Sequence, residues 1–115
     1  MFKKFTNQRQ RGYNSIVSIY KRGQINLNKG ALRDILGSSG QFIELFYDIK
    51  NRRVGIKEAK RKALGAIKVK VRGGSALITS KAFFDYYNIL PIETQKFELE
   101  YNEKEDIYYI QLRVA

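Results

Sequence analysis

Three short segments of this chain recur in the same order about fifty residues further on, and this internal repeat limits the available folds more than any other feature. The matching pairs are Arg22-Gly23 with Arg72-Gly73, Ala31-Leu32-Arg33-Asp34 with Ala82-Phe83-Phe84-Asp85, and Tyr47-Asp48 with Tyr101-Asn102. In each copy the first segment has the composition of a turn, the second that of a helix and the third that of a strand end. This shared order indicates a duplicated structural unit.

The first copy has the pattern of two strands, a short helix and two further strands. Residues 16–20 are mainly β-branched and aromatic, Lys21-Arg22-Gly23 has the composition of a turn, and residues 24–28 alternate apolar with polar. Asn28 is a typical helix N-cap and Gly37 a typical stop, which predicts a helix over 31–36. Residues 41–47 and 53–57 flank turn residues and predict a hairpin.

The second copy has the same order of elements. A strand is predicted over 67–71, followed by a turn at Arg72-Gly73-Gly74 and a strand over 76–78. Thr79 or Ser80 is the expected cap of a helix over 81–87. A hairpin of residues 97–101 and 107–114 completes the second unit.

Neither unit is large enough to bury both faces of its strands alone. Two units that interleave their hairpins close into a barrel, which leaves no exposed sheet edge. The predicted fold is therefore mainly β with two short helices, a tandem β-β-α-β-β repeat that forms a pseudo-symmetric swapped-hairpin barrel. We expect a flexible basic arm over 1–13 and a single domain over 14–115, composed of repeats 14–58 and 65–115 and a charged connector 59–64.

The first repeat resembles the swapped-hairpin domains of the AbrB/SpoVT/MraZ group of bacterial and archaeal DNA-binding regulators. Gly23-Gln24-Ile25-Asn26-Leu27 is similar to the strand after the family's glycine turn, and residues 31–37 are similar to its helix, which ends in Leu-Gly. The resemblance implies an AbrB-like barrel that binds DNA in transcription regulation. Of the family's DNA-contacting basic residues, Arg33 carries over by position, and Phe84 stands at the corresponding place in the second repeat.

Positive charge is concentrated in the first half of the chain. The 115 residues include 22 Lys and Arg against 11 Asp and Glu, a formal net charge of +11. Residues 1–62 hold 15 of the basic and four of the acidic residues, and the remainder holds seven of each. A one-sided charge of this size is typical of a polyanion-binding surface. We therefore expect the first repeat and the arm to dock on phosphates, with the second repeat as a support or as an interaction face.

Fourteen basic residues are candidates for nucleic-acid contact. They lie in the arm, the first repeat and the connector: Lys3, Lys4, Arg9, Arg11, Lys21, Arg22, Lys29, Arg33, Arg52, Arg53, Lys57, Lys60, Arg61 and Lys62. Arg52 and Arg53 are adjacent, so strand alternation predicts that they point to opposite faces. The aromatic residues of the helix over 81–87 cover too wide an arc for one buried face, and Phe84 and Tyr87 are the predicted contacts with a protein partner.

The chain contains no Cys and no His, which excludes cysteine nucleophiles, histidine bases and zinc sites that need nitrogen or sulfur ligands. We therefore predict no enzymatic activity, no metal and no cofactor. The sequence also lacks the apolar run of a secretory signal or of a membrane-spanning helix, which favours a cytoplasmic, nucleoid-associated protein.

Three functions remain open from the sequence. The leading hypothesis is a small basic protein that binds double-stranded DNA as a transcriptional regulator or nucleoid-associated factor. The same charge suits an RNA-binding or ribonucleoprotein component. The third hypothesis is a non-enzymatic adaptor or inhibitor that binds a protein partner. The sequence also leaves open whether two chains pair as a homodimer.

Overall fold

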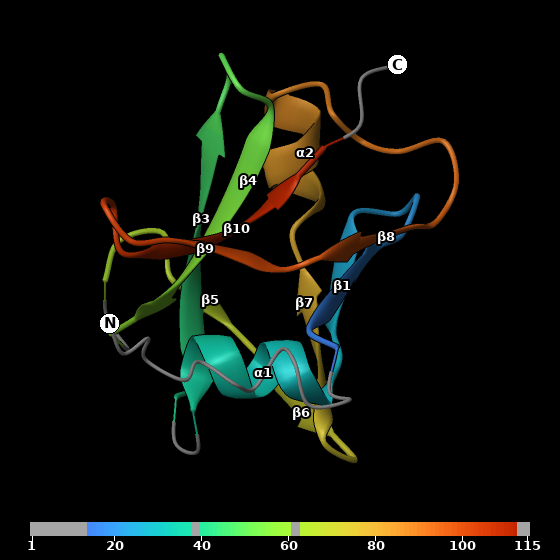
Figure 1. The fold of residues 1–115 in the computed structure, drawn as a ribbon. Helices are drawn as coiled ribbons and strands as arrows, with labels where there is room; N and C mark the ends of the chain where they lie inside the picture. The colour runs from blue at the N-terminus through green and yellow to red at the C-terminus, as the bar shows by residue number, and fades with distance from the viewer. Residues whose placement is uncertain (1–13, 38–39, 61–62, 113–115) are drawn as a thin grey trace.

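The computed structural model describes residues 14–37, 40–60 and 63–112. Within these residues the chain is mainly β, with two short helices (Figure 1). The helices are α1 (Lys29–Leu36) and α2 (Lys81–Tyr86). The strands are β1 (Ile16–Ile19), β2 (Gln24–Leu27), β3 (Phe42–Asp48), β4 (Arg53–Ala59), β5 (Ile67–Lys68), β6 (Lys70–Arg72), β7 (Ser75–Thr79), β8 (Gln95–Glu98), β9 (Glu100–Asn102) and β10 (Ile107–Gln111).

The strands form two antiparallel sheets of five strands each, and each sheet takes strands from both halves of the chain. Sheet A has the order β6-β7-β2-β1-β8, and sheet B has the order β5-β3-β4-β10-β9. At the centre of sheet A, β2 of the first half pairs with β7 of the second. At the centre of sheet B, β4 of the first half pairs with β10 of the second. The two halves are therefore interleaved along the whole molecule.

Two positions carry the chain directly from one sheet into the other. Val69 separates β5 at the edge of sheet B from β6 at the edge of sheet A, and Leu99 separates β8 from β9 in the same way. Both side chains are buried, and both amides donate hydrogen bonds of 2.9 Å, Val69 to the carbonyl of Gln41 and Leu99 to that of Ser15. Because the ladders are divided at these residues, the strands form two sheets and not the single closed barrel expected from the sequence.

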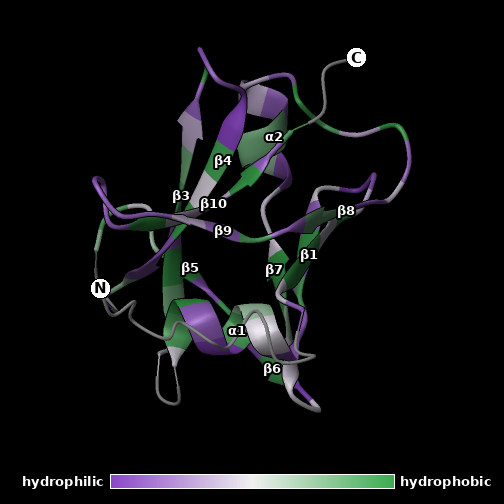
Figure 2. Cartoon of the chain, in the orientation of Figure 1, coloured by the Kyte–Doolittle hydropathy of each residue, from purple (hydrophilic) through white to green (hydrophobic). Residues whose placement is uncertain are grey.

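The core lies between the sheets. Inward-facing residues such as Val17, Ile25, Ile56, Ile78 and Ile110 are fully buried because alternate side chains of each strand face the other sheet. The two helices lie at opposite ends of the pair of sheets (Figure 1). Hydrophobic residues follow strands such as β1 and β7, whereas the peripheral hairpin turns are largely hydrophilic (Figure 2).

The ends of α1 follow the chemistry expected from the sequence. Asn28 is its N-cap, and the Asn28 Oδ1 accepts hydrogen bonds from the backbone amides of Ala31 at 2.9 Å and Ile16 at 3.0 Å. Gly37 ends the helix with φ +64°, a backbone conformation that favours glycine. The single Asn28 side chain thus joins the first turn of α1 to the start of β1.

The boundaries of three other predicted elements differ from expectation. Strand β4 extends to Ala59, two residues further than predicted and into the range expected for the connector. Ser80 takes the cap position of α2 but makes no side-chain capping hydrogen bond. The long strands expected over 67–71 and 97–101 are each divided where the chain changes sheet. The predicted arm over 1–13 lies outside the described residues.

Candidate nucleic-acid interface

Charge is divided unevenly between the two sheets as well as between the two halves of the chain. Sheet A and the turns within it carry five basic residues and one acidic residue, whereas sheet B and its turns carry six basic and seven acidic residues. The basic residues of sheet A are Lys21, Arg22, Lys70, Arg72 and Lys96, and all five are exposed. Three of these five come from the second half. The expectation that the first repeat alone carries the basic surface therefore does not hold for sheet A.

One row of side chains crosses the outer face of sheet A from edge to edge. The strand register places these five residues side by side: Lys70, Leu77, Asn26, Ser18 and Lys96. At a spacing of about 4.8 Å per strand, the two lysines at the ends of the row are about 19 Å apart along the sheet. The row thus has a lysine at each edge and smaller, largely polar side chains between them.

The middle of this face, which we call its floor, contains two shallow depressions. Asn26 lies in the walls of two adjoining depressions, one of about 360 Å³ that includes Lys70 and Arg72 and one of about 350 Å³ that includes Lys96. Ser18 also lines the depression beside Lys96, and neighbouring groups cover it to 7% exposure. The neutral amide and hydroxyl groups of the floor therefore lie between a basic rim at Lys70 and Arg72 and a rim at which Lys96 stands near Glu98.

Further basic residues lie at the two ends of the central β2–β7 pair. At one end, Lys21 and Arg22 stand in the β1–β2 turn next to Gly23, which packs against the backbone of Lys81 at the start of α2. At the other end, the side chain of Lys29 lies against the β6–β7 turn, with its Cδ 3.8 Å from the Cβ position of Gly74. Each end combines a turn from one half of the chain with the helix start of the other half.

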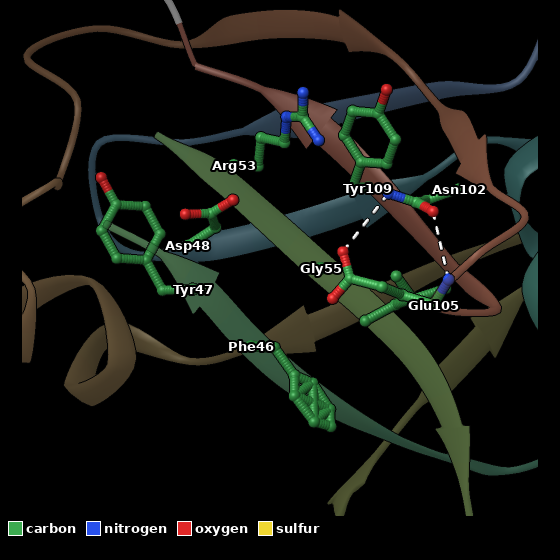
Figure 3. Close-up of a pocket in the computed structure, with 9 residues that line it drawn as sticks. Phe46, Tyr47, Asp48, Arg53, Gly55, Asn102, Glu105 and Tyr109 are labelled. Atoms are coloured by element: carbon green, nitrogen blue, oxygen red, sulfur yellow. Dashed lines mark hydrogen bonds between the residues drawn. The ribbon is translucent and has the colours of Figure 1, made fainter. Parts of the chain in front are cut away.

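The outer face of sheet B has a different chemical character. A hollow of about 160 Å³ opens over Gly55, with Phe46 on one side and Tyr109 on the other (Figure 3). Gly55 leaves no room for a side chain, because a Cβ there would lie 2.6 Å from the Cδ1 of Ile107. This hollow is lined by aromatic and aliphatic groups at its centre.

Carboxylates stand at the rim of the hollow over Gly55. Asn51 donates hydrogen bonds to Asp48 from its side-chain amide at 2.9 Å and from its backbone amide at 3.1 Å. These bonds, and the nearby Arg53, lower the pKa of Asp48, so its carboxyl is charged at neutral pH. Glu105 lies at the opposite rim, hydrogen bonded to Asn102 (Figure 3). Two carboxylates against the single guanidinium of Arg53 make this hollow a poor site for phosphate.

The structure separates the candidate basic residues into two groups. Lys21, Arg22 and Lys29 border sheet A, as described above. Arg52, Arg53 and Lys57 belong to the β3–β4 hairpin of sheet B, and Lys60 follows that hairpin. Arg33 is exposed on α1. Lys3, Lys4, Arg9, Arg11, Arg61 and Lys62 lie outside the described residues.

Arg52 and Arg53 lie in different surroundings, but the reason is not strand alternation, because Arg52 belongs to the turn and β4 begins at Arg53. The guanidinium of Arg53 lies 4.8 Å from the centre of the Tyr109 ring on the outer face of sheet B. Arg52 lies in the turn with φ +56° and lines a separate hollow beside the end of α2. The two adjacent arginines therefore do not contribute to one surface.

The prediction that Phe84 contacts a partner is wrong for this structure. Phe84 is fully buried, with its ring 5.4 Å from that of Phe83, because α2 inserts this side chain into the core. Tyr87 is partly buried, whereas Tyr86 is 80% exposed. The expectation that at least one aromatic residue of this helix is exposed is confirmed, and the residue concerned is Tyr86.

Sequence reasoning missed Lys70, Arg72 and Lys96 as candidates. The signal for the first two was present, because residues 68–72 alternate basic with apolar side chains, and a strand of that pattern turns its basic residues to one face. The charge totals of the two halves do not reveal this alternation, because the second half has equal numbers of basic and acidic residues. Lys96 lies in β8, which pairs with β1 from the far end of the chain, so only the sheet order brings it to this face.

Within the described residues, no group of three or more acidic side chains is placed to hold a metal ion. None of the helices there has the length and apolar character required to span a bilayer. Comparison of the chain with models of known protein families, with curated proteins and with solved structures found no match.

Proposed function

We propose that this protein binds double-stranded DNA through the outer face of sheet A and acts as a small regulatory or nucleoid-associated factor. The observation that carries the proposal is the five-to-one excess of basic over acidic residues in sheet A and its turns. A surface of this kind binds a polyanion by replacing the cations condensed around the phosphates.

The spacing of the basic groups suits a double helix. Lys70 and Lys96 stand about 19 Å apart across the sheet, which exceeds the major-groove width of about 12 Å, so they reach phosphates on both sides of a groove. Along the β2–β7 pair, about 20 Å separates Gly23, at the end of the turn with Lys21 and Arg22, from Lys29. Phosphate contacts in both directions fix the orientation of a duplex on the sheet.

Between the two rims, the sheet offers groups that hydrogen bond to base edges. Gln24 and Asn26 alternate with the buried Ile25 and Leu27, so their amides face outward. Amide side chains of this type pair with adenine in the major groove. Sequence preference is therefore expected to be modest and to depend on these two residues of β2.

We also propose that the fold is a duplicated swapped-hairpin arrangement like that of the AbrB/SpoVT/MraZ group. The interleaved strand orders of both sheets support this, because each sheet takes strands from both repeats. Superposition of the backbone of residues 14–58 on that of residues 65–115 tests the duplication. Two halves with unrelated backbones would overturn it.

The binding proposal is tested by fluorescence anisotropy with a short blunt DNA duplex over a range of salt concentrations. Six basic groups on or beside sheet A, namely Lys21, Arg22, Lys29, Lys70, Arg72 and Lys96, predict that log K falls against log salt with a slope of about −5. Absence of binding at low salt, or affinity that does not change with salt, would overturn the proposal.

A matched pair of double variants locates the surface. The Lys70→Gln/Lys96→Gln protein is expected to bind more weakly, with a salt slope shallower by about 2. The Lys57→Gln/Lys104→Gln protein removes the same charge from exposed positions of sheet B and is expected to bind nearly as well as the parent. Equal losses in the two variants would show that only net charge matters and would contradict a role for sheet A.

Competition with duplex RNA of the same sequence separates DNA binding from RNA binding. The A-form helix has a deep, narrow major groove, which outward amides of a sheet do not enter. Duplex DNA is therefore expected to compete better than duplex RNA. Stronger competition by RNA would overturn the assignment to DNA.

A further inference from the structure

The hollow beside Arg52, of about 720 Å³, lies at the end of α2 and apart from the outer face of sheet A. It is lined by Tyr47, Ile49, Arg52, Tyr86, Tyr87, Asn88 and Ile89. These residues come from the β3–β4 hairpin of the first half and from the end of α2 in the second half. We refer to this site as the Tyr86 hollow.

The walls of the Tyr86 hollow are aromatic and partly open. The ring of Tyr87 lies 4.8 Å from that of Tyr47 and 4.8 Å from that of Tyr86, with its plane at 86° to the Tyr86 plane. Tyr86 is 80% exposed, and Ile49 of the β3–β4 turn is 71% exposed. The hollow therefore presents tyrosine rings within a largely polar lining, beside two side chains that solvent reaches freely.

The Tyr86 hollow carries a positive charge. Arg52 is the single charged residue among those that line the hollow. Its carbonyl accepts a hydrogen bond of 2.9 Å from the Leu112 amide, which holds the turn in place. Among the described residues, no hydrogen bond or ion pair engages the Arg52 guanidinium. An occupant with a flat ring and an anionic group matches this combination of tyrosine faces and one guanidinium.

Helix α2 connects the Tyr86 hollow to one end of the basic surface proposed above. Helix α2 begins at Lys81, against the β1–β2 turn with Lys21 and Arg22, and ends at Tyr86. The rise from Lys81 to Tyr86 is about 7.5 Å, or roughly two nucleotide steps of 3.4 Å along one strand. A strand that leaves the phosphate contacts at the turn would reach the hollow within two or three nucleotides.

We propose that the Tyr86 hollow stacks an unpaired base of a nucleic acid whose duplex part lies on sheet A. This inference rests on the proposed function and adds a preference for the junction between double and single strands. Tyrosine stacking accepts any base, because every base has a π-face. The Arg52 guanidinium is placed to pair with the phosphate of the stacked nucleotide.

The chain contains no tryptophan, which provides a direct probe. In Tyr86→Trp the indole becomes the sole tryptophan, and stacking of a base on it is expected to quench its emission strongly when a duplex with a single-stranded tail is added. A blunt duplex is expected to leave the emission nearly unchanged. Tyr101→Trp is the matched control, because Tyr101 also lies 4.8 Å from a second tyrosine ring, Tyr108, but beside the carboxylates of the β9–β10 turn.

Affinity measurements test the same site in the parent chain. The tail is expected to increase affinity over the blunt duplex by about tenfold. Tyr86→Ala is expected to remove that gain and to leave blunt-duplex binding unchanged. Arg52→Asn, which keeps a residue that tolerates the positive φ of 56°, is expected to reduce the gain. A tail of abasic nucleotides, which has phosphates but no bases, is expected to give little gain.

The outcomes separate this inference from the proposed function. Blunt-duplex binding without any gain from a tail would overturn the Tyr86 hollow as a base site and leave the duplex surface standing. Quenching by the tail without duplex binding would overturn the duplex surface alone. Equal quenching by an acidic peptide, or equal gain from the abasic tail, would overturn base stacking and favour a protein ligand or simple charge attraction.

Discussion

Gly23 in the β1–β2 turn lies directly against the backbone of Lys81 at the start of α2. A Cβ on Gly23 would stand 2.5 Å from the Cα of Lys81, closer than real Cβ contacts. The Gly23 carbonyl also accepts a hydrogen bond of 3.0 Å from the Ser80 amide. A turn of the first half therefore supports the helix of the second half, and the same contact holds Lys21 and Arg22 at the end of sheet A.

Gly23→Ala is expected to destabilise the protein by about 3 kcal/mol, because the new Cβ adds a backbone clash to an unfavourable φ of +83°. Gly73→Ala is the matched control, since Gly73 also has positive φ but nothing within 4 Å of its Cβ position. That variant is expected to lose only about 1 kcal/mol. Urea denaturation followed by circular dichroism measures both, and equal losses would contradict the contact with Lys81.

Asn28→Ala is expected to lower the free energy of unfolding by about 2 kcal/mol, because one side chain accepts hydrogen bonds from both Ala31 and Ile16. Ser80→Ala, at the equivalent position before α2, removes no capping hydrogen bond and is expected to cost less than about 1 kcal/mol. Equilibrium unfolding of the two variants provides the comparison. A larger loss at Ser80 would show that the caps are assigned to the wrong helix.

Phe84→Ala is expected to cost about 3–5 kcal/mol, because it leaves a large cavity at a fully buried position. Tyr86→Ala, two residues further along the chain and 80% exposed, is expected to change stability by less than about 0.5 kcal/mol. Thermal unfolding distinguishes the two. Similar melting temperatures for both variants would be inconsistent with the placement of Phe84 in the core.

Alkaline pH is expected to weaken the β9–β10 hairpin through Tyr101. The hydrogen bond that Tyr101 donates to Asp106, together with partial desolvation and the charge of Asp106, raises the pKa of the Tyr101 phenol. Because the folded-state pKa lies above the unfolded value near 10, this stabilisation is complete below about pH 10 and is lost as pH rises through the folded-state pKa.

The control for Tyr101 is Tyr101→Phe, which keeps the ring contact with Tyr108 but has no proton to lose. The parent protein is expected to lose more stability than this variant as pH rises above about 10. Urea midpoints at a series of alkaline pH values measure the difference, with tyrosinate absorbance to follow the ionisation. Parallel pH profiles for the two proteins would contradict the hydrogen bond to Asp106.

Local chemistry made much of the fold predictable. Helix α1 begins after Asn28 and ends before Gly37, as expected. Both signals act over three or four residues, so a local stretch of sequence is enough to show them. The hairpin of β3 and β4 was predictable for the same reason, since its turn residues stand between a strongly apolar segment and an alternating one. The mainly β class with two short helices is confirmed by the structure.

The composition of each sheet was not predictable, because it depends on contacts between residues far apart in the chain. Lys96 comes to the same face as Ser18 only because β8 pairs with β1. Phe84 was assigned to the surface because a six-residue helix is too short for its apolar pattern to distinguish the buried side from the exposed one. Tyr86 and Arg52 come together across the two halves, which no local pattern records.

The crossings at Val69 and Leu99 have a consequence for any attempt to shorten this protein. Since each sheet is completed only by strands from both ends of the chain, a fragment that ends near residue 60 keeps β1 and β2 without their partners β7 and β8, and β4 without β10. Severed pieces are expected to acquire structure only when mixed, as a complementing pair. The smallest autonomous version of this molecule must therefore retain both repeats.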